Sequence, residues 1–171
     1  MMEAIKIGEW SLRSWEKDDV PALVKYADNR KIWLNVRDAF PHPYTRKDAE
    51  AWINTMQDPL TNFAIASPVE AIGGVGFNLQ EDIYCRSAEI GYWLGEPFWN
   101  RGIATMAVAA TAKYAFAAFD LVRLYTTVFE WNPASARVLE KNGFKLEGRL
   151  RKSVTKDGKT IDSLQYALVA E

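Results

Sequence analysis

The sequence is poor in the residues that build disulfides and metal centres. Its 171 residues include one cysteine, Cys85, and one histidine, His42. A lone cysteine cannot form an internal disulfide, and a lone histidine leaves no His/Cys ligand set for zinc. We therefore expect no metal in the protein, and a reducing, cytoplasmic setting.

The sequence also lacks an excess of charge and a long apolar run. Lys and Arg number 21 against 22 Asp and Glu, a net charge of −1, which gives no general attraction to a nucleic-acid backbone. The most apolar stretch, Met106 to Phe119, is interrupted by Lys113, and the first ten residues do not resemble a signal peptide. We expect neither a nucleic-acid partner nor a membrane span.

The composition that remains is that of a globular protein. Apolar residues make up 49% of the chain, charged residues 25% and aromatic residues 13%, which argues against disorder and fibrous structure. A chain of this length can bury a substantial core without disulfide or metal staples. The expectation is a single domain over residues 1–171.

The first half of the chain predicts a strand, two helices and three more strands. Asp18 or Asp19 followed by Pro21 indicates a helix start, and Thr45 with Asp48 resembles a capping box. The expected elements are a strand over 5–15, a helix to about 27, a loop or short helix over 29–44, a helix from 45 to 57, and an antiparallel meander of strands over 63–66, 69–79 and 87–94.

The second half begins with a long helix after Gly102. Apolar residues from position 104 to 119 recur with the spacing of a helix packed on a sheet. A strand over 124–129, a helix over 133–142 closed by Gly143, and a final hairpin turning at Asp157-Gly158 follow. The order β-α-α-β-β-β-α-β-α-β-β indicates one α/β fold.

The segment from Ala88 to Thr105 has the pattern of an anion site. It reads as a strand, a bend containing glycine and proline, and a glycine at the start of the long helix. Gly102 allows a close approach to the backbone, and the free N–H groups and dipole of a helix N-terminus favour an anion such as a pyrophosphate. Alone, the pattern is better explained as an ordinary strand-to-helix turn that contains a glycine.

A second segment, Asn132 to Phe144 (NPASARVLEKNGF), gives the first one a more specific interpretation. Together they resemble the GNAT superfamily of acyl-CoA N-acyltransferases, in which [Q/R]xxGx[G/A] precedes the pyrophosphate helix. That motif falls here on Trp99, Gly102 and Ala104, with Trp99 departing from the usual Gln or Arg. EIGYWL and the FPHPYTRKDA segment resemble the Rim-type branch, the N-terminal acetyltransferases of ribosomal proteins.

The resemblance implies the GNAT fold: a mixed, largely antiparallel twisted sheet of about seven strands flanked by four helices. It also implies acetyl-CoA as the acetyl donor, with the pantetheine arm in a gap between the strands 89–94 and 124–129. The backbone of Tyr92, Trp93 and Leu94 would pair with the pantetheine amides. The implied cofactor-binding residues are Tyr92, Trp93, Leu94, Asn100, Arg101, Gly102, Ile103, Ala104, Thr105, Asn132 and Ser135.

The catalytic residues are harder to assign, because the tyrosine that many members use as the acid is replaced by Leu139. Ser135 lies four residues earlier on the same helical face and is one candidate, although a serine there also suits a helix cap. Glu89 is the candidate base, or else part of an ion pair. Asn132 either contacts the cofactor or starts an Asn-Pro turn, and a backbone N–H near Trp93 or Leu94 is a candidate oxyanion donor.

An amine acceptor completes the expected reaction. Because an α-amine has a pKa of about 7.7–8.0, against about 10.4 for lysine, the weak base candidates favour a protein N-terminus. A small amine, a polyamine, an aminoglycoside-like drug or a non-catalytic acyl-CoA-binding role are the alternatives. The predicted acceptor residues are Arg37, Phe40, His42, Tyr44, Phe77 and Tyr84; for His42 and the aromatic residues, core or loop packing is the more common explanation. An exposed final strand suggests a homodimer.

Overall fold

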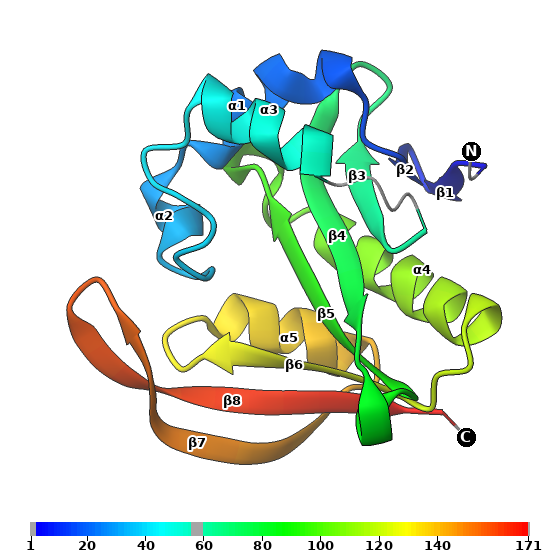
Figure 1. The fold of residues 1–171 in the computed structure, drawn as a ribbon, viewed down its shortest axis with the longest axis vertical. Helices are drawn as coiled ribbons and strands as arrows, with labels where there is room; N and C mark the ends of the chain where they lie inside the picture. The colour runs from blue at the N-terminus through cyan, green and yellow to red at the C-terminus, as the bar shows by residue number, and fades with distance from the viewer. Residues whose placement is uncertain (1–2, 56–59, 171) are drawn as a thin grey trace.

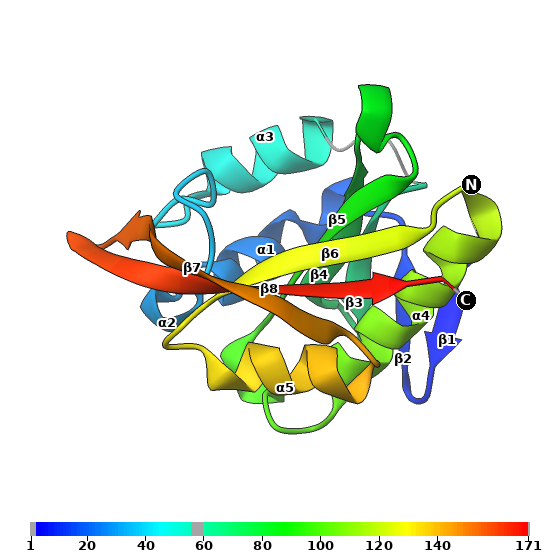
Figure 2. The same cartoon turned by 90° about the horizontal axis from the view of Figure 1, so that it is seen from below.

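The computed structural model describes residues 3–55 and 60–170, which form one mixed sheet with helices on both faces (Figures 1 and 2). The sheet has the strand order β1-β2-β3-β4-β5-β6-β8-β7. The strands are β1 (Ile5–Ile7), β2 (Trp10–Arg13), β3 (Asn62–Ala66), β4 (Ala71–Leu79), β5 (Ser87–Leu94), β6 (Arg123–Phe129), β7 (Lys145–Lys156) and β8 (Lys159–Val169). The α-helices are α1 (Val20–Ala27), α2 (Arg30–Trp33), α3 (Arg46–Thr55), α4 (Ile103–Ala118) and α5 (Pro133–Lys141).

The element order agrees with the expectation, with two differences. The strand expected over 5–15 is a hairpin, because Gly8 has φ +70° and turns the chain between β1 and β2, which raises the strand count to eight. The segment 29–44 contains the short helix α2, which adds a fifth helix. The capping box at α3 is confirmed by reciprocal Thr45 and Asp48 hydrogen bonds, whereas residue 57 lies outside the described residues.

The two faces of the sheet carry different layers (Figure 2). On one face α4 and α5 cover the main core, where Phe63, Ile90 and Leu124 are almost fully buried. On the other face α1 and α3 pack together around a smaller cluster that includes Leu23 and Tyr44. Since neighbouring residues of a strand point to opposite faces, each central strand contributes to both layers.

The parallel pair β5 and β6 opens into a gap. Its ladder contains three residue pairs, ending at Glu89 and Tyr125. Beyond them β5 continues along β4 to Leu94, while β6 follows β8 to Phe129, so the two strands diverge (Figure 1). The splay between strands 89–94 and 124–129 that the family resemblance implied is therefore present.

The last hairpin turns at Asp157 and Gly158 as expected, but its final strand is not at the sheet edge. β8 lies between β6 and β7, and β7 is the edge strand. The expectation of an exposed final strand was wrong, because β7 folds back outside β8. Any pairing of two copies through this side of the sheet would use β7.

The tip of the β7–β8 hairpin reaches the segment after α2. Lys156 is only 2% exposed, donates to the Asp38 carboxylate at 2.6 Å, and its ammonium lies 3.8 Å from the centre of the Trp33 indole. Asp157 accepts from Arg30 at 2.6 Å. These contacts join elements more than a hundred residues apart and hold the segment 30–38 against the sheet.

No helix in the described part of the chain is long and apolar enough to cross a bilayer.

Candidate active site

The N-terminus of α4 presents unpaired backbone N–H groups beside the gap. Gly102 precedes the helix with φ +75°, a conformation that favours glycine. The first intrahelical bond runs from Met106 N–H to Gly102 C=O, so the N–H groups of Ile103, Ala104 and Thr105 have no partner within the helix. These donors and the helix dipole make a site for an anion.

A cavity of about 470 Å³ extends from this helix end into the gap. We call it the α4 cleft. All eleven residues predicted to bind the cofactor line it, from Tyr92 on β5 to Ser135 on α5. Its charged lining residues in the described chain are all cationic: Lys31, Arg101, Arg137 and Lys141. Lys31 is bonded to Glu96, and Arg101 lies 4.8 Å from the centre of the Trp10 ring. The cleft therefore suits an anionic ligand.

The alternation of β5 decides which backbone groups face the gap. Gly95 N–H donates to Ile72 C=O on the β4 side, whereas Arg86 C=O accepts from Val122 N–H on the β6 side. With an unbroken β4–β5 register, odd-numbered residues turn their backbone groups to β4 and even-numbered ones to β6. Tyr92 and Leu94 therefore face the gap. The prediction that the Trp93 backbone also does so was wrong, because Trp93 pairs with Gly74 of β4.

Trp99, the residue that departs from the family motif, has a defined partner. Its indole Nε1 donates to the Leu94 carbonyl at 2.7 Å. This bond satisfies the last β5 carbonyl that faces the gap. The Leu94 N–H has no partner on β6, because the β5–β6 ladder ends at Glu89 and Tyr125. Leu94 N–H is therefore the better of the two predicted oxyanion donors.

Tyr92 and Ser135 bridge the gap between β5 and α5. The Tyr92 hydroxyl lies 2.6 Å from Ser135 Oγ and donates to the Ser135 carbonyl at 3.2 Å. Burial raises the pKa of Tyr92 to about 12, so its hydroxyl keeps its proton at neutral pH. Sequence reasoning assigned Tyr92 a backbone role only. Leu139, where a tyrosine was expected, is fully buried in the core.

Asn132 is the N-cap of α5. Its side-chain oxygen accepts from Ser135 N–H at 3.3 Å, and Pro133 begins the helix. The serine is therefore not the cap, and its hydroxyl is directed to Tyr92. Asn132 also lines the α4 cleft, so its capping role holds α5 at the gap.

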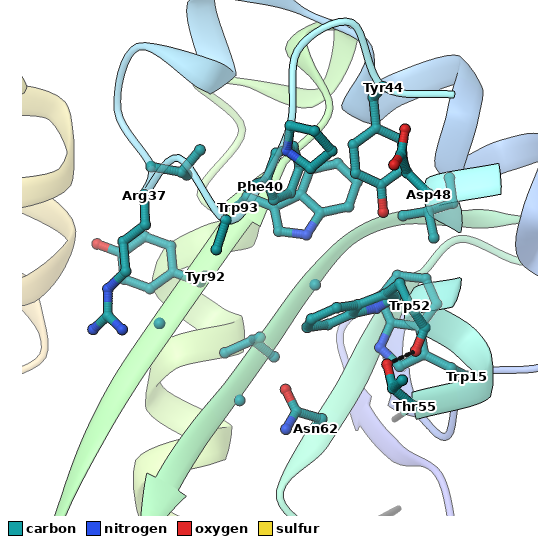
Figure 3. A pocket seen from close by; sticks show the side chains of 18 of the residues that line it. Trp15, Arg37, Phe40, Tyr44, Asp48, Trp52, Thr55, Asn62, Tyr92 and Trp93 are labelled. Carbon is teal, nitrogen blue, oxygen red and sulfur yellow. Dashed lines mark hydrogen bonds between the residues drawn. The ribbon is translucent and has the colours of Figure 1, made fainter. Parts of the chain in front are cut away.

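A second cavity, of about 560 Å³, lies over β4 and β5 on the face that carries α1 and α3 (Figure 3). We call it the aromatic cavity. Three of the six predicted acceptor residues line it: Arg37, Phe40 and Tyr44. Tyr92 and Trp93 line both cavities, so the two spaces meet at the end of β5.

Arg37 and Glu89, predicted to bind the acceptor and to act as base, are partners. Arg37 Nη2 donates to Glu89 Oε1 at 2.5 Å, and this bond raises the pKa of the guanidinium. Glu89 lies on the same face of β5 as Gly91 and Trp93, toward the aromatic cavity. The ion pair considered as the alternative role of Glu89 is present.

The other three predicted acceptor residues lie outside both cavities. Phe77 is 1% exposed and packs against Phe119 with ring centres 5.3 Å apart, because its side chain points to the opposite face of β4. Tyr84 is 65% exposed in the β4–β5 connection. His42 lies against Trp33 at 5.8 Å between ring centres. We withdraw all three from the acceptor site.

Comparison with known proteins identifies the family to which this chain belongs. Residues 10–145 match the model of the family described as "Acetyltransferase (GNAT) domain". An uncharacterised N-acetyltransferase of Bacillus subtilis, YoaA, is 37% identical over 100 residues, which cover 58% of this chain and 56% of YoaA. The ribosomal-protein-serine acetyltransferase of Escherichia coli is 31% identical over 160 residues, covering 90% of this chain and 89% of the relative.

A solved structure of RimL, the ribosomal L7/L12 α-N-protein acetyltransferase, in complex with coenzyme A superposes with a TM-score of 0.85 at 25% identity, covering 98% of each chain. The chain belongs to the GNAT acetyltransferase family. Its enzyme class is therefore the one expected, an acetyl-CoA-dependent N-acetyltransferase.

Proposed function

We propose that this chain moves the acetyl group of acetyl-CoA to a primary amine, with a protein N-terminal α-amine as the leading acceptor. The observation that carries the proposal is the junction of two unlike cavities at Tyr92 and Trp93. The cationic α4 cleft suits the charged donor, and the aromatic cavity suits a less charged acceptor.

In this arrangement the donor is held mainly by backbone. The N–H groups at Ile103, Ala104 and Thr105 would bind the pyrophosphate, assisted by the cationic lining of the cleft. The backbone groups of Tyr92 and Leu94 that face the gap would pair with the pantetheine arm or with the thioester oxygen. A backbone N–H already directed at this oxygen stabilises the negative charge that develops on it as the amine attacks.

The sulfur leaves as a thiolate and must gain a proton or a hydrogen bond. The Tyr92 and Ser135 hydroxyl groups lie in the gap and can donate to the thiolate. Because the pKa of Tyr92 is about 12, its hydroxyl stays protonated at any working pH. The proton lost by the amine passes to Glu89 or to solvent. An α-amine needs only weak assistance here, since its reference pKa is about 7.7–8.0.

The acceptor assignment draws on the relatives as well. The Escherichia coli relative is named for acetylating serine of ribosomal proteins, and RimL for an α-N-protein acceptor. Polyamines and aminoglycosides are less well supported, because Asp48 is the one acidic residue in the described lining of the aromatic cavity. Several carboxylates would be needed to bind such polycations.

Thiol release and product mass test the proposal. The enzyme is incubated with acetyl-CoA and three acceptors: a peptide with a free N-terminus, the same peptide blocked at its N-terminus but containing lysine, and spermidine. We expect acetylation of the free peptide only. Turnover of the blocked peptide would make lysine side chains the acceptor, and turnover of spermidine would make polyamines the acceptor. Binding of acetyl-CoA without thiol release would show a non-catalytic binding protein.

A further inference from the structure

We propose that the aromatic cavity selects amines that carry an aromatic ring, or another flat apolar group, next to the reacting nitrogen. The inference rests on the proposed function, because it names the acceptor class of the same site. Three features of the cavity carry it: its walls, its floor and its charge.

The walls consist of aromatic rings that the fold leaves partly uncovered. Trp15, Phe40, Trp52 and Trp93 are half-buried and line the cavity (Figure 3). Phe40 lies edge-on to Trp93, with 5.6 Å between ring centres and an interplanar angle of 71°. Aromatic rings prefer such edge-to-face and offset contacts, and burying their remaining apolar surface favours binding. A flat apolar group is the ligand that gains most from these walls.

The floor is a part of the sheet where two glycines lie side by side. Gly76 of β4 and Gly91 of β5 are directly opposed in the antiparallel ladder, and both line the cavity. A Cβ built on Gly91 meets no atom within 4 Å, so the space above it is open. Above Gly76 the Asn62 side chain occupies the space that a Cβ would take. A planar group can therefore lie on the backbone at Gly91, beside Asn62.

Gly74 is needed for the shape of the same floor. A Cβ there would lie 2.9 Å from Trp93 Nε1 and 3.1 Å from Trp15 Cζ2, closer than side chains normally approach. The glycine lets both indoles lie against β4. The walls and the floor therefore depend on each other.

The charge of the cavity favours a cationic amine over an acidic group. Asp48 is the acidic lining residue, and hydrogen bonds from the Thr45 hydroxyl and N–H lower the pKa of its carboxyl. Arg37, the basic lining residue, is bonded to Glu89. The carboxylate can attract the ammonium form of an amine as it enters, and the ring of the acceptor then contacts the walls. A serine or alanine N-terminus would leave most of the aromatic surface uncovered.

Gly91→Leu is the central test variant, because its Cβ meets no atom within 4 Å and its side chain would enter the space above the floor. Gly148→Leu is its matched control: a Cβ at Gly148 also meets nothing within 4 Å, but the residue lies on β7 outside both cavities. Trp52→Leu removes one wall and keeps an apolar side chain.

The acceptors are peptides that differ only in the first residue (Phe, Trp, Ser or Ala), together with phenethylamine as a free arylalkylamine. We expect kcat/KM for the aromatic acceptors to exceed that for the Ser and Ala peptides at least tenfold. Gly91→Leu should raise KM for the aromatic acceptors at least tenfold and leave the acetyl-CoA Kd unchanged, with Gly148→Leu like the wild type. Trp52→Leu should lower the aromatic preference. Comparing kcat/KM for phenethylamine with kcat/KM for the Phe peptide shows whether the preferred acceptor is a small free amine or a peptide N-terminus.

A preference for Ser or Ala peptides that Gly91→Leu does not change would overturn the inference and leave the proposed function intact. Binding of phenethylamine in the absence of acetyl-CoA is followed separately by tryptophan fluorescence. If phenethylamine binds and Gly91→Leu weakens this binding, but no acceptor is acetylated, the inference holds and the proposed function fails.

Discussion

The α4 cleft and the aromatic cavity share Tyr92 and Trp93 but are built in different ways. The α4 cleft presents backbone N–H groups and four cationic side chains, from Lys31, Arg101, Arg137 and Lys141. The aromatic cavity presents indole and phenyl rings over a floor that contains Gly76 and Gly91, with one carboxylate at Asp48. In the proposed arrangement the donor would be held by groups that most substitutions leave in place, and the acceptor by side chains that a single substitution can change.

This difference predicts that donor binding and acceptor binding respond to separate mutations. The aromatic cavity can vary its side chains without disturbing the helix N-terminus proposed to bind the donor. Substitutions of the Tyr92–Ser135 pair should affect neither affinity strongly but should slow the chemical step, while substitutions that lie in one cavity alone should leave binding in the other unchanged.

The largest effect on kcat is expected at the Tyr92–Ser135 pair. Tyr92→Phe removes the hydroxyl that lies 2.6 Å from Ser135 Oγ, and Ser135→Ala removes its partner. Each should lower kcat about tenfold to a hundredfold, the value of a hydrogen bond to a developing charge, and change the acetyl-CoA Kd little. Steady-state kinetics and calorimetry check this. Equal losses in kcat and in acetyl-CoA affinity would instead make the pair a binding element.

A smaller effect is expected at the hairpin tip, which holds the segment before Arg37 and Phe40. Lys156→Met removes the bond to Asp38 and the contact with Trp33, and should cost about 1–3 kcal/mol in the free energy of unfolding. The acceptor KM should rise more than the acetyl-CoA Kd. Lys156→Arg, which retains the charge, is the control. A change in the acetyl-CoA Kd larger than the change in the acceptor KM would contradict the separation of donor and acceptor binding.

Glu89→Gln should lower kcat/KM by less than about tenfold, because an α-amine with a reference pKa near 7.7–8.0 supplies much of its own free base at pH 8. A pH–rate profile of the wild type and the variant measures this. A thousandfold loss at every pH would make Glu89 an essential base and would favour an acceptor of higher pKa.

The smallest effect concerns stability at high pH. Burial raises the pKa of Tyr44 and of Tyr92 to about 12, while tyrosines of the unfolded chain titrate near 10. Between these values the unfolded state has fewer bound protons than the folded state, so stability falls as the pH rises from about 10 to 12. Urea unfolding at pH 9 and pH 11 should show the loss, and Tyr44→Phe should reduce it. If Tyr44→Phe loses as much stability between pH 9 and pH 11 as the wild type, groups other than Tyr44 cause the loss.

The α4 cleft could be predicted from the sequence because its parts are local. A strand, a bend and Gly102 follow one another within 88–105, and the Asn132 cap lies within 132–144. The orientation of the Trp93 backbone was mispredicted, since it depends on the pairing of β5 with β4, which the local sequence does not specify.

The aromatic cavity was predicted only in part, because it forms from distant segments. The local loop supplied Arg37, Phe40 and Tyr44, but Trp15, Trp52 and Gly91 come from three other segments: the connection after β2, α3 and β5. Phe77 and Tyr84 were assigned by residue type without knowledge of which face of β4, or which end of the sheet, each would occupy. The Tyr92–Ser135 contact likewise requires the distance across the gap.

The most direct test of the central claim is the affinity of acetyl-CoA for two variants of Gly102, measured by calorimetry. Asp and Asn have the same shape, and both tolerate the left-handed φ of +75° at this position, where a Cβ meets no neighbouring atom. If the α4 N-terminus binds the pyrophosphate, Gly102→Asp should weaken binding at least about a hundredfold through like-charge repulsion, and Gly102→Asn by less than about tenfold. Equal affinity of the two variants would contradict the assignment of the donor site.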